Sequence, residues 1–280
     1  MMTPGSRCLV ALALGLLACG PRPPAAELRV CADPNNLPFS NQRGEGFENR
    51  LAEIVAKDLG ATVRYTWWPQ RRGFVRNTLG AHKCDVVMGM PWGAERVLTT
   101  RPYYRSSYVF VFRKDRHLDV RSLDDPALRR LRIGVQLVGD DGANTPPVHA
   151  LSRRGIVGNL VGYSVFGDYA QPNPPARIID GVVAGDVDLA IAWGPLAGYF
   201  ARHARVPMEV VPVAPVFDPP GLRLAFDISL AVRRGEDDFE RRLQSVLDRR
   251  KPDIDRLLAE YGVPIAPPAS EEESRLPTPP

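Results

Sequence analysis

Lysine is scarce in this chain of 280 residues, since only four of its 36 basic residues are lysine and the rest are arginine. The arginines are interspersed with acidic residues, the formal net charge is +4, and no basic run is interleaved with aromatic residues. Nucleic-acid binding needs a basic stripe that neutralises phosphates. The absence of such a stripe disfavours nucleic-acid partners.

The sequence also lacks the short motifs of common enzyme classes. Its four histidines are far apart and form no HExxH zinc pattern, and there is no GxSxG elbow, no phosphate loop and no GxGxxG fingerprint. Cys31 and Cys84 lie in apolar strand contexts, which raise the pKa of a thiol and make it unreactive. We therefore predict a protein that is not an enzyme, with no catalytic residues, no metal site and no cofactor.

Long apolar runs are limited to one segment, residues 8–19, which is too short to span a bilayer. It follows Arg7 and precedes a proline-rich stretch, as a secretory signal does. The stretch at residues 16–20 matches a lipobox, in which Cys19 would carry lipid; the alternative is simple cleavage near Ala26. Either alternative predicts export to the periplasm, with residues 1–26 as signal peptide or lipoprotein tether.

Cysteine is also rare, and export determines how the four cysteines are interpreted. Cys8 and Cys19 belong to the targeting segment, so only Cys31 and Cys84 remain in the mature protein. Two cysteines in an oxidising compartment favour a disulfide, with two buried free thiols as the alternative.

The remaining sequence alternates between apolar strands and amphipathic helices, and 44% of its residues are hydrophobic. We predict strands at residues 28–32, 63–67 and 85–90, with a helix at 47–59 closed by Gly60. This order indicates a parallel sheet. Ligands of such sheets bind beyond the carboxyl ends of the strands, which places residues 33–39, 67–68 and 90–93 around one mouth.

A second α/β unit follows, and the chain then returns to the first. A further strand at residues 107–113 ends the first unit, and the second unit has predicted strands at 131–136 and 189–193. The return has a strand at 227–233 and a final helix interrupted at Pro252. We predict a bilobal α/β fold of the type II periplasmic binding-protein class, with two crossover segments and a cleft between the lobes. The predicted divisions are lobe 1 (27–113), lobe 2 (114–212), the return to lobe 1 (213–263) and a disordered tail (264–280).

Several strings within residues 28–262 resemble a known family. Pro38-Phe39, Gly46-Phe47-Glu48 and Arg101-Pro102-Tyr103-Tyr104 are similar in order and spacing to family 3 extracellular solute-binding proteins. Longer strings resemble the methanol oxidation system proteins of the MoxJ or XoxJ type, which accompany quinoprotein methanol dehydrogenases; they are CADPNNLPFSN, QRRGFVRNTL, KCDVVMGMP, RPYYRSSYVFV and IGVQLVGDDGANTPPVHAL.

The resemblance also has departures that bear on the ligand. Amino-acid binders of this family hold the ligand carboxylate with an arginine and its ammonium with an aspartate. Here Arg96 aligns poorly with the arginine, and Trp193-Gly194 stands at the aspartate position. A buried ammonium without a counter-ion is unfavourable, so a free amino acid is disfavoured.

An aromatic cleft with a few polar groups is the predicted site, suited to a flat ligand or to a loop of a partner protein. Tryptophans at strand ends are also common packing residues, and the loop at residues 139–144 is either an ion-binding loop or a tight turn. The candidate cleft residues are Asp33, Asn35, Asn36, Phe39, Trp67, Trp68, Trp92, Asp140, Asp141, Asn144, Tyr169 and Trp193.

Two functional hypotheses follow. The resemblance implies a non-catalytic periplasmic accessory protein that assists or activates a PQQ-dependent methanol or alcohol dehydrogenase, its protein partner. The alternative is a solute-binding protein that delivers a ligand other than an amino acid to an ABC transporter. A small or flat ligand in the cleft is compatible with both hypotheses, and membrane contact is expected only through a lipid anchor.

Overall fold

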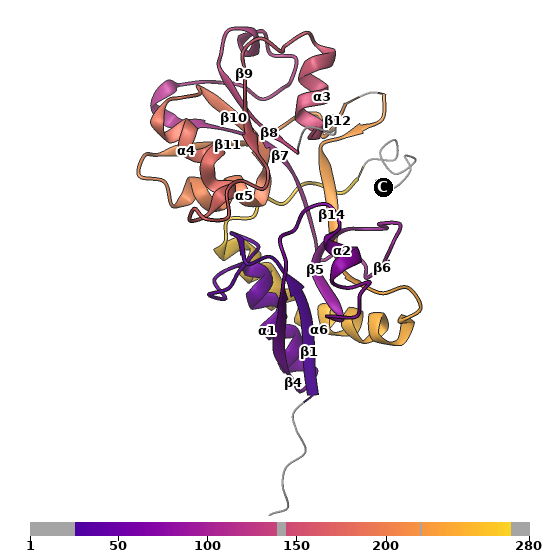
Figure 1. The fold of residues 1–280 in the computed structure, drawn as a ribbon. Coiled ribbons are helices and arrows are strands. Elements are labelled where there is room, and N and C mark those ends of the chain that lie inside the picture. Colours follow the sequence, from indigo (N-terminus) through magenta and orange to yellow (C-terminus); the bar gives the residue numbers. More distant parts are fainter. Residues whose placement is uncertain (1–25, 139–143, 219, 270–280) are drawn as a thin grey trace, which may run out of the picture.

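The computed structural model describes residues 26–138, 144–218 and 220–269, and it has two α/β lobes joined by two long strands (Figure 1). The joining strands are β7 (Tyr104–Arg113) and β14 (Ala225–Val232). They pair with each other between the lobes, so that the strands of both lobes form one hydrogen-bonded path. The predicted bilobal α/β fold class is confirmed.

Lobe 1 is built on parallel strands in the order β4, β1, β5, with β14 antiparallel to β5. Helix α1 covers this sheet because Phe47, Leu51 and Val55 repeat at helical spacing and are completely buried. The elements of this lobe are β1 (Ala26–Ala32), β2 (Asn35–Asn36), β3 (Ser40–Asn41), α1 (Phe47–Asp58), β4 (Ala61–Trp67), α2 (Phe74–Asn77), β5 (Val86–Pro91), β6 (Leu98–Thr99) and α6 (Asp237–Glu260).

Helix α6 continues through Pro252, so the predicted interruption there is wrong. Proline removes one backbone donor from a helix, but apolar residues on both sides of it pack into one core. The burial of this shared apolar face keeps the two halves in a single helix. The buried residues of α6 are Leu243, Val246, Leu247, Ile254, Leu257 and Leu258.

Lobe 2 has a mixed sheet with apolar residues on both faces. Strand β10 lies between β8, to which it is parallel, and β7, to which it is antiparallel. The edge strands β9 and β11 are not predicted from the sequence, and both are only partly buried. The elements are β8 (Ile133–Leu137), α3 (Pro146–Arg153), β9 (Leu160–Ser164), α4 (Arg177–Ala184), β10 (Leu189–Trp193), α5 (Gly194–Arg202), β11 (Met208–Pro212), β12 (Phe217–Asp218), β13 (Leu222–Arg223) and the 3-10 helices η1 (Lys114–Arg116), η2 (Pro126–Arg129) and η3 (Pro174–Ala176).

The crossover strands change lobes within their length. The first residues of β7, up to Ser107, pair with β14, while the rest of the strand pairs with β10 and β11. Tyr104 packs into the core of lobe 1, and Tyr108 and Leu224 pack into a core of lobe 2. We propose that the lobes divide at this change of partner, after Ser107 in β7 and at the start of β14. The boundaries expected from the sequence lie at residues 113 and 213 instead.

The last described segment, residues 262–269, forms a third connection between the lobes, here called the C-terminal strap (Figure 1). The backbone N–H of Ala266 donates to the carbonyl of Arg105, and the Arg105 Nε donates to the carbonyl of Pro267 at 2.8 Å. Ser106 donates to the carbonyl of Pro264 at 2.5 Å. The predicted disordered tail is therefore corrected for residues 264–269, which pack against the protein. The rest of the predicted tail lies outside the described residues.

The strap also packs against helix α5 of lobe 2. A Cβ atom added at Gly198 would lie only 2.0 Å from the Gly262 carbonyl oxygen, so glycine is needed there for the close approach. Nearby, Arg202 donates to the carbonyls of Ala259 and Glu260 at the end of α6, at 3.0 and 2.8 Å. A guanidinium at this position satisfies helix-terminal carbonyls and links the two lobes.

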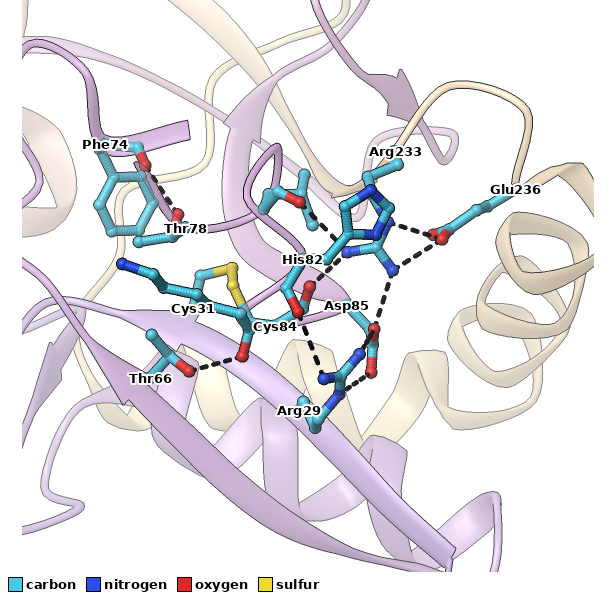
Figure 2. The surroundings of a disulfide bond; sticks show 12 residues. Arg29, Cys31, Thr66, Phe74, Thr78, His82, Cys84, Asp85, Arg233 and Glu236 are labelled. Atoms are coloured by element: carbon cyan, nitrogen blue, oxygen red, sulfur yellow. Dashed lines mark hydrogen bonds and ion pairs between the residues drawn. A yellow bond between two sulfur atoms is a disulfide. The ribbon is translucent and has the colours of Figure 1, made fainter. Parts of the chain in front are cut away.

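Cys31 and Cys84 form a disulfide, with their Cα atoms 5.4 Å apart, which confirms the predicted pairing. Figure 2 shows an ion-pair cluster beside it, in which Arg29 and Arg233 both point at Asp85. Arg29 donates twice to the Asp85 carboxylate, at 2.8 and 2.5 Å, and Arg233 donates once at 2.8 Å. These guanidinium hydrogen bonds lower the pKa of Asp85 against the opposing effect of burial.

Candidate functional site

A cavity of about 460 Å³ lies between the two lobes, at the carboxyl ends of their parallel strands. Lobe 1 lines it with residues such as Asp33, Phe39 and Pro91, and lobe 2 with residues such as Gln136 and Tyr169. The volume is within the range of small-molecule sites in proteins.

Three aromatic rings from neighbouring strands form part of the cavity wall. Trp193 ends β10, and its ring packs edge-on against Tyr108 of β7 and Phe226 of β14, with centroid distances of 5.6 and 5.9 Å. Edge-to-face packing of this kind holds aromatic rings in fixed orientations. Because two of the rings stand on the crossover strands, the aromatic wall lies next to the joint between the lobes.

Asp33 is the buried polar centre of the lobe 1 side, with only 2% of its surface exposed. One carboxylate oxygen, Oδ1, accepts from the backbone N–H of Asn35 at 2.8 Å, and Oδ2 accepts from the backbone N–H of Gln70 at 2.6 Å. These bonds fix the loops that follow β1 and β4. The carboxylate thus faces the cavity, and hydrogen bonds from backbone N–H groups already stabilise its negative charge.

Tyr169 of lobe 2 completes this network across the mouth of the cavity. Its hydroxyl donates to Asp33 Oδ2 at 2.5 Å, and the Arg71 guanidinium lies 4.8 Å from the centre of its ring. Burial, followed by the hydrogen bond to the Asp33 carboxylate and by its charge, raises the pKa of Tyr169, so the hydroxyl stays protonated and donates. Asn35 adds a second interlobe bond, from Nδ2 to the carbonyl of Gln171 at 2.9 Å. We call the bonds of Asp33 and Asn35 to lobe 2 the interlobe latch.

Replacing Tyr169 by phenylalanine is expected to shift the protein toward an open arrangement of the lobes. The change removes one hydrogen bond to a charged group, and the closed-to-open ratio should fall on the order of tenfold. Small-angle X-ray scattering would detect the change as a larger radius of gyration than that of the wild type. Tyr163→Phe is the matched control, because its hydroxyl makes no hydrogen bond between the lobes within the part of the chain that the structure describes. Identical scattering from Tyr169→Phe and wild type would contradict the role of the latch.

Glu48 lies behind the Asp33 side of the site, near the start of α1, and is almost completely buried. Burial, and then the charge of Asp33, raises the pKa of Glu48 to about 8. The Glu48 carboxyl is therefore largely protonated at neutral pH, which limits the negative charge in this part of lobe 1.

Known proteins match the chain over most of its length. The model of bacterial extracellular solute-binding proteins, family 3, matches residues 28–264. The chain belongs to this family. Protein MoxJ of Methylorubrum extorquens is 32% identical over 257 residues, covering 88% of this chain and 84% of the relative. Protein MoxJ of Paracoccus denitrificans is 29% identical over 258 residues, covering 86% of this chain and 89% of the relative.

Among solved structures, the periplasmic binding protein XoxJ from Methylobacterium extorquens AM1 is 41% identical and superposes with a TM-score of 0.71, covering 86% of this chain and all of that one. The resemblance to proteins of the MoxJ or XoxJ type is thereby confirmed.

Neither of the residues compared above with the amino-acid clamp supplies a charged group to the cavity. Arg96 is exposed and does not line the cavity. At Gly194 an added Cβ atom would lie 2.6 Å from the Ser107 carbonyl oxygen, so an aspartate cannot replace this glycine without moving β7. Among the described residues, no arginine, lysine or histidine lines the cavity. A ligand carboxylate would therefore be unpaired in this site.

Three of the four candidate tryptophans lie outside the cavity wall, so the predicted cluster of four is corrected. Trp67 stacks on Tyr65 at 4.5 Å on β4, the outer strand of lobe 1. Trp68 is 36% exposed, with the Lys83 ammonium 5.1 Å from its ring. Trp92 lies in the turn that follows β5, is 49% exposed and does not line the cavity.

The other candidates divide into two groups. Asp33, Asn36, Phe39, Asn144, Tyr169 and Trp193 line the cavity, and Asn35 borders it through the interlobe latch. Asp140 and Asp141, and also Cys19, lie outside the described residues.

Several cavity residues are not found by the sequence argument. They include Tyr108 and Phe226 on the crossover strands and Gln136 near the end of β8. The sequence does mark Tyr108 as a strand residue, because it begins an apolar run. Alternate residues of this run, Tyr108, Phe110 and Phe112, pack into a core of lobe 2.

Within the described ranges, no group of three or more histidine, cysteine, aspartate or glutamate side chains could hold a metal ion, and no helix is both long and apolar enough to cross a membrane.

Proposed function

We propose that this family 3 protein is a non-catalytic accessory component of a PQQ-dependent methanol or alcohol oxidation system. It binds the quinoprotein dehydrogenase in the periplasm and assists or activates it. One observation carries this proposal: the interlobe cavity has the position of a solute site, but its described lining is an aromatic wall without basic residues in place of an amino-acid clamp. The similarity to MoxJ and XoxJ over most of the chain supports it.

Export is part of this proposal. The family is described as extracellular, and the apolar segment at residues 8–19 has the features of a secretory signal. Under this proposal Cys19 either carries lipid or is removed with the signal. The disulfide agrees with an oxidising compartment.

Capture of the partner tests the accessory role. Tagged mature protein, beginning at Glu27, would be used to recover partners from the periplasm of the native host grown on methanol. We expect a PQQ-dependent dehydrogenase to be recovered. Recovery of no protein together with a tightly held small molecule would contradict the accessory role.

Trp193→Ala is expected to weaken dehydrogenase binding by about 30-fold, because buried tryptophans at recognition sites are frequent hot spots. Trp92→Ala is the matched control: its side chain is exposed outside the cavity wall, and we expect wild-type affinity. Surface plasmon resonance with the captured dehydrogenase would measure both variants, with circular dichroism to verify that each is folded. Equal affinities for Trp193→Ala and wild type would exclude the cavity as the contact surface.

A second candidate is a solute-binding protein of an ABC transporter with a ligand other than an amino acid. The interlobe latch favours it, since the two lobes contact each other across a cavity of small-molecule size, about 460 Å³. In this case the purified protein would hold a small molecule and would stimulate the ATPase of a permease rather than bind a dehydrogenase.

A further inference from the structure

The charge of the interlobe cavity restricts what can enter it. Asp33 is the one charged side chain among the described residues that line the cavity. An anionic ligand would meet this carboxylate and no cation, which is unfavourable in a buried site. A cationic ligand gains little either, because Asp33 already accepts from Asn35, Gln70 and Tyr169. The electrostatics therefore favour an uncharged ligand.

Two buried polar side chains in the wall have no hydrogen-bond partner among the described residues. Gln136 is 5% exposed and Tyr108 is 9% exposed, and both line the cavity. The Gln136 amide offers one acceptor and two donor hydrogens, and the Tyr108 hydroxyl can donate and accept. Burial alone raises the pKa of Tyr108, so this hydroxyl is protonated. These polar atoms are open to the cavity rather than enclosed in the core, so they are available to bind the polar group of a ligand.

Gln136 and Tyr108 stand on the two strands that flank β10, at the end where Trp193 lies. Tyr108 of β7 is the register partner of Trp193, and β8, which carries Gln136, pairs with the other edge of β10. Phe39 and Phe226 add two further aromatic side chains to the same cavity. A flat ring in contact with these aromatic surfaces can place a polar substituent near Gln136 or Tyr108.

We propose that the cavity binds an uncharged aromatic molecule that carries both a hydrogen-bond donor and an acceptor, such as an aromatic carboxamide. The Gln136 amide and the Tyr108 hydroxyl bind its polar group, and the aromatic wall binds its ring. This assignment rests on the proposed function only in taking the interlobe cavity as the recognition site. It excludes multiply charged anions as ligands of the closed cavity.

Three probes of nearly equal shape test the assignment: benzamide, benzoate and benzylammonium. Each would be titrated into the purified protein and followed by ligand-observed NMR. We expect benzamide to bind at least about tenfold more tightly than the two charged probes, because a buried charge without a counter-ion is unfavourable. The tightest binding by benzoate or benzylammonium, equal binding by all three, or binding by none would overturn the proposal.

Two variants identify the polar contacts. Gln136→Leu keeps the size of the side chain but removes its amide, and Tyr108→Phe removes only a hydroxyl. Each should weaken benzamide binding by roughly five- to tenfold, the value for one hydrogen bond. Gln42→Leu, at an exposed position outside the cavity, is the matched control and should bind as the wild type does. Wild-type affinity in both folded cavity variants would overturn the assignment of these contacts.

The two proposals fail separately in these experiments. Benzamide binding without recovery of a dehydrogenase would contradict the accessory role and leave the ligand class standing. Recovery of a dehydrogenase by a protein that binds none of the three probes would overturn the ligand class and leave the accessory role standing.

Discussion

Replacing Cys31 and Cys84 together by alanine is expected to lower the free energy of unfolding by about 4 kcal/mol. The disulfide joins residues 53 positions apart, and the chain-entropy treatment of a loop of that length gives about this value. Both cysteines are also buried, in a cluster with Phe74 and Leu79, so the loss of packing acts in the same direction.

Urea unfolding followed by circular dichroism measures this effect. The wild type in the presence of a reductant should unfold at nearly the same urea concentration as the double variant, and the reductant should not change the variant. A double variant as stable as the oxidised wild type would show that the disulfide contributes no stability. The expected loss is a large part of the stability of an ordinary domain, about 5–15 kcal/mol.

Glu48→Gln is expected to stabilise the protein at high pH and to have little effect at low pH. Burial favours the protonated carboxyl, and its pKa rises from 4.5 to about 8 on folding. A carboxyl whose pKa is raised on folding allows full stability below pH 4.5, and this stability is lost as the pH rises toward 8. The loss above pH 8 is on the order of 5 kcal/mol, and glutamine avoids it.

The pH dependence of unfolding separates this effect from a change in packing. The difference between Glu48→Gln and wild type should be small at about pH 5 and should grow with pH until about pH 8. Asp33, Tyr103 and Tyr104 are the neighbouring titratable groups, and both tyrosines have a raised pKa and remain neutral throughout this range. Glu53→Gln, an exposed change on the same helix, is the control. A constant difference between Glu48→Gln and wild type at every pH would show that the Glu48 carboxyl does not titrate as described.

The fold could be predicted from the sequence because its elements are encoded locally. The spacing of Phe47, Leu51 and Val55 defines a helix face, and the continuously apolar stretch at residues 86–90 predicts the strand β5, whose first three residues are buried. The partly buried edge strands β9 and β11 have no such pattern, which is why they were not predicted. Pro252 predicts an interrupted helix, but α6 is continuous because its buried residues pack against parts of lobe 1 that are distant in sequence.

The site was predictable only in part, because its residues come together from both lobes. Residues after β1 could be placed at the mouth from the rule for parallel sheets, and Asp33 and Phe39 do line the cavity. That rule does not distinguish an outer strand from a central one, so it also selected Trp67 and Trp68. The contribution of Tyr108 and Phe226 depends on where β7 and β14 cross between the lobes, and strand periodicity carries no information about that.

The C-terminal strap has a mechanical consequence for a protein of this shape. Two adjacent strands alone form a narrow joint, about which one lobe can both bend and twist. The strap holds Arg105 and Ser106 on one of these strands and passes beside Gly198 on helix α5. A third tether at the joint resists twisting more than bending, so we expect the lobes to move along essentially one direction. The rigidity of that joint then depends on residues 262–269, far in sequence from the start of β7, one of the two strands that form it.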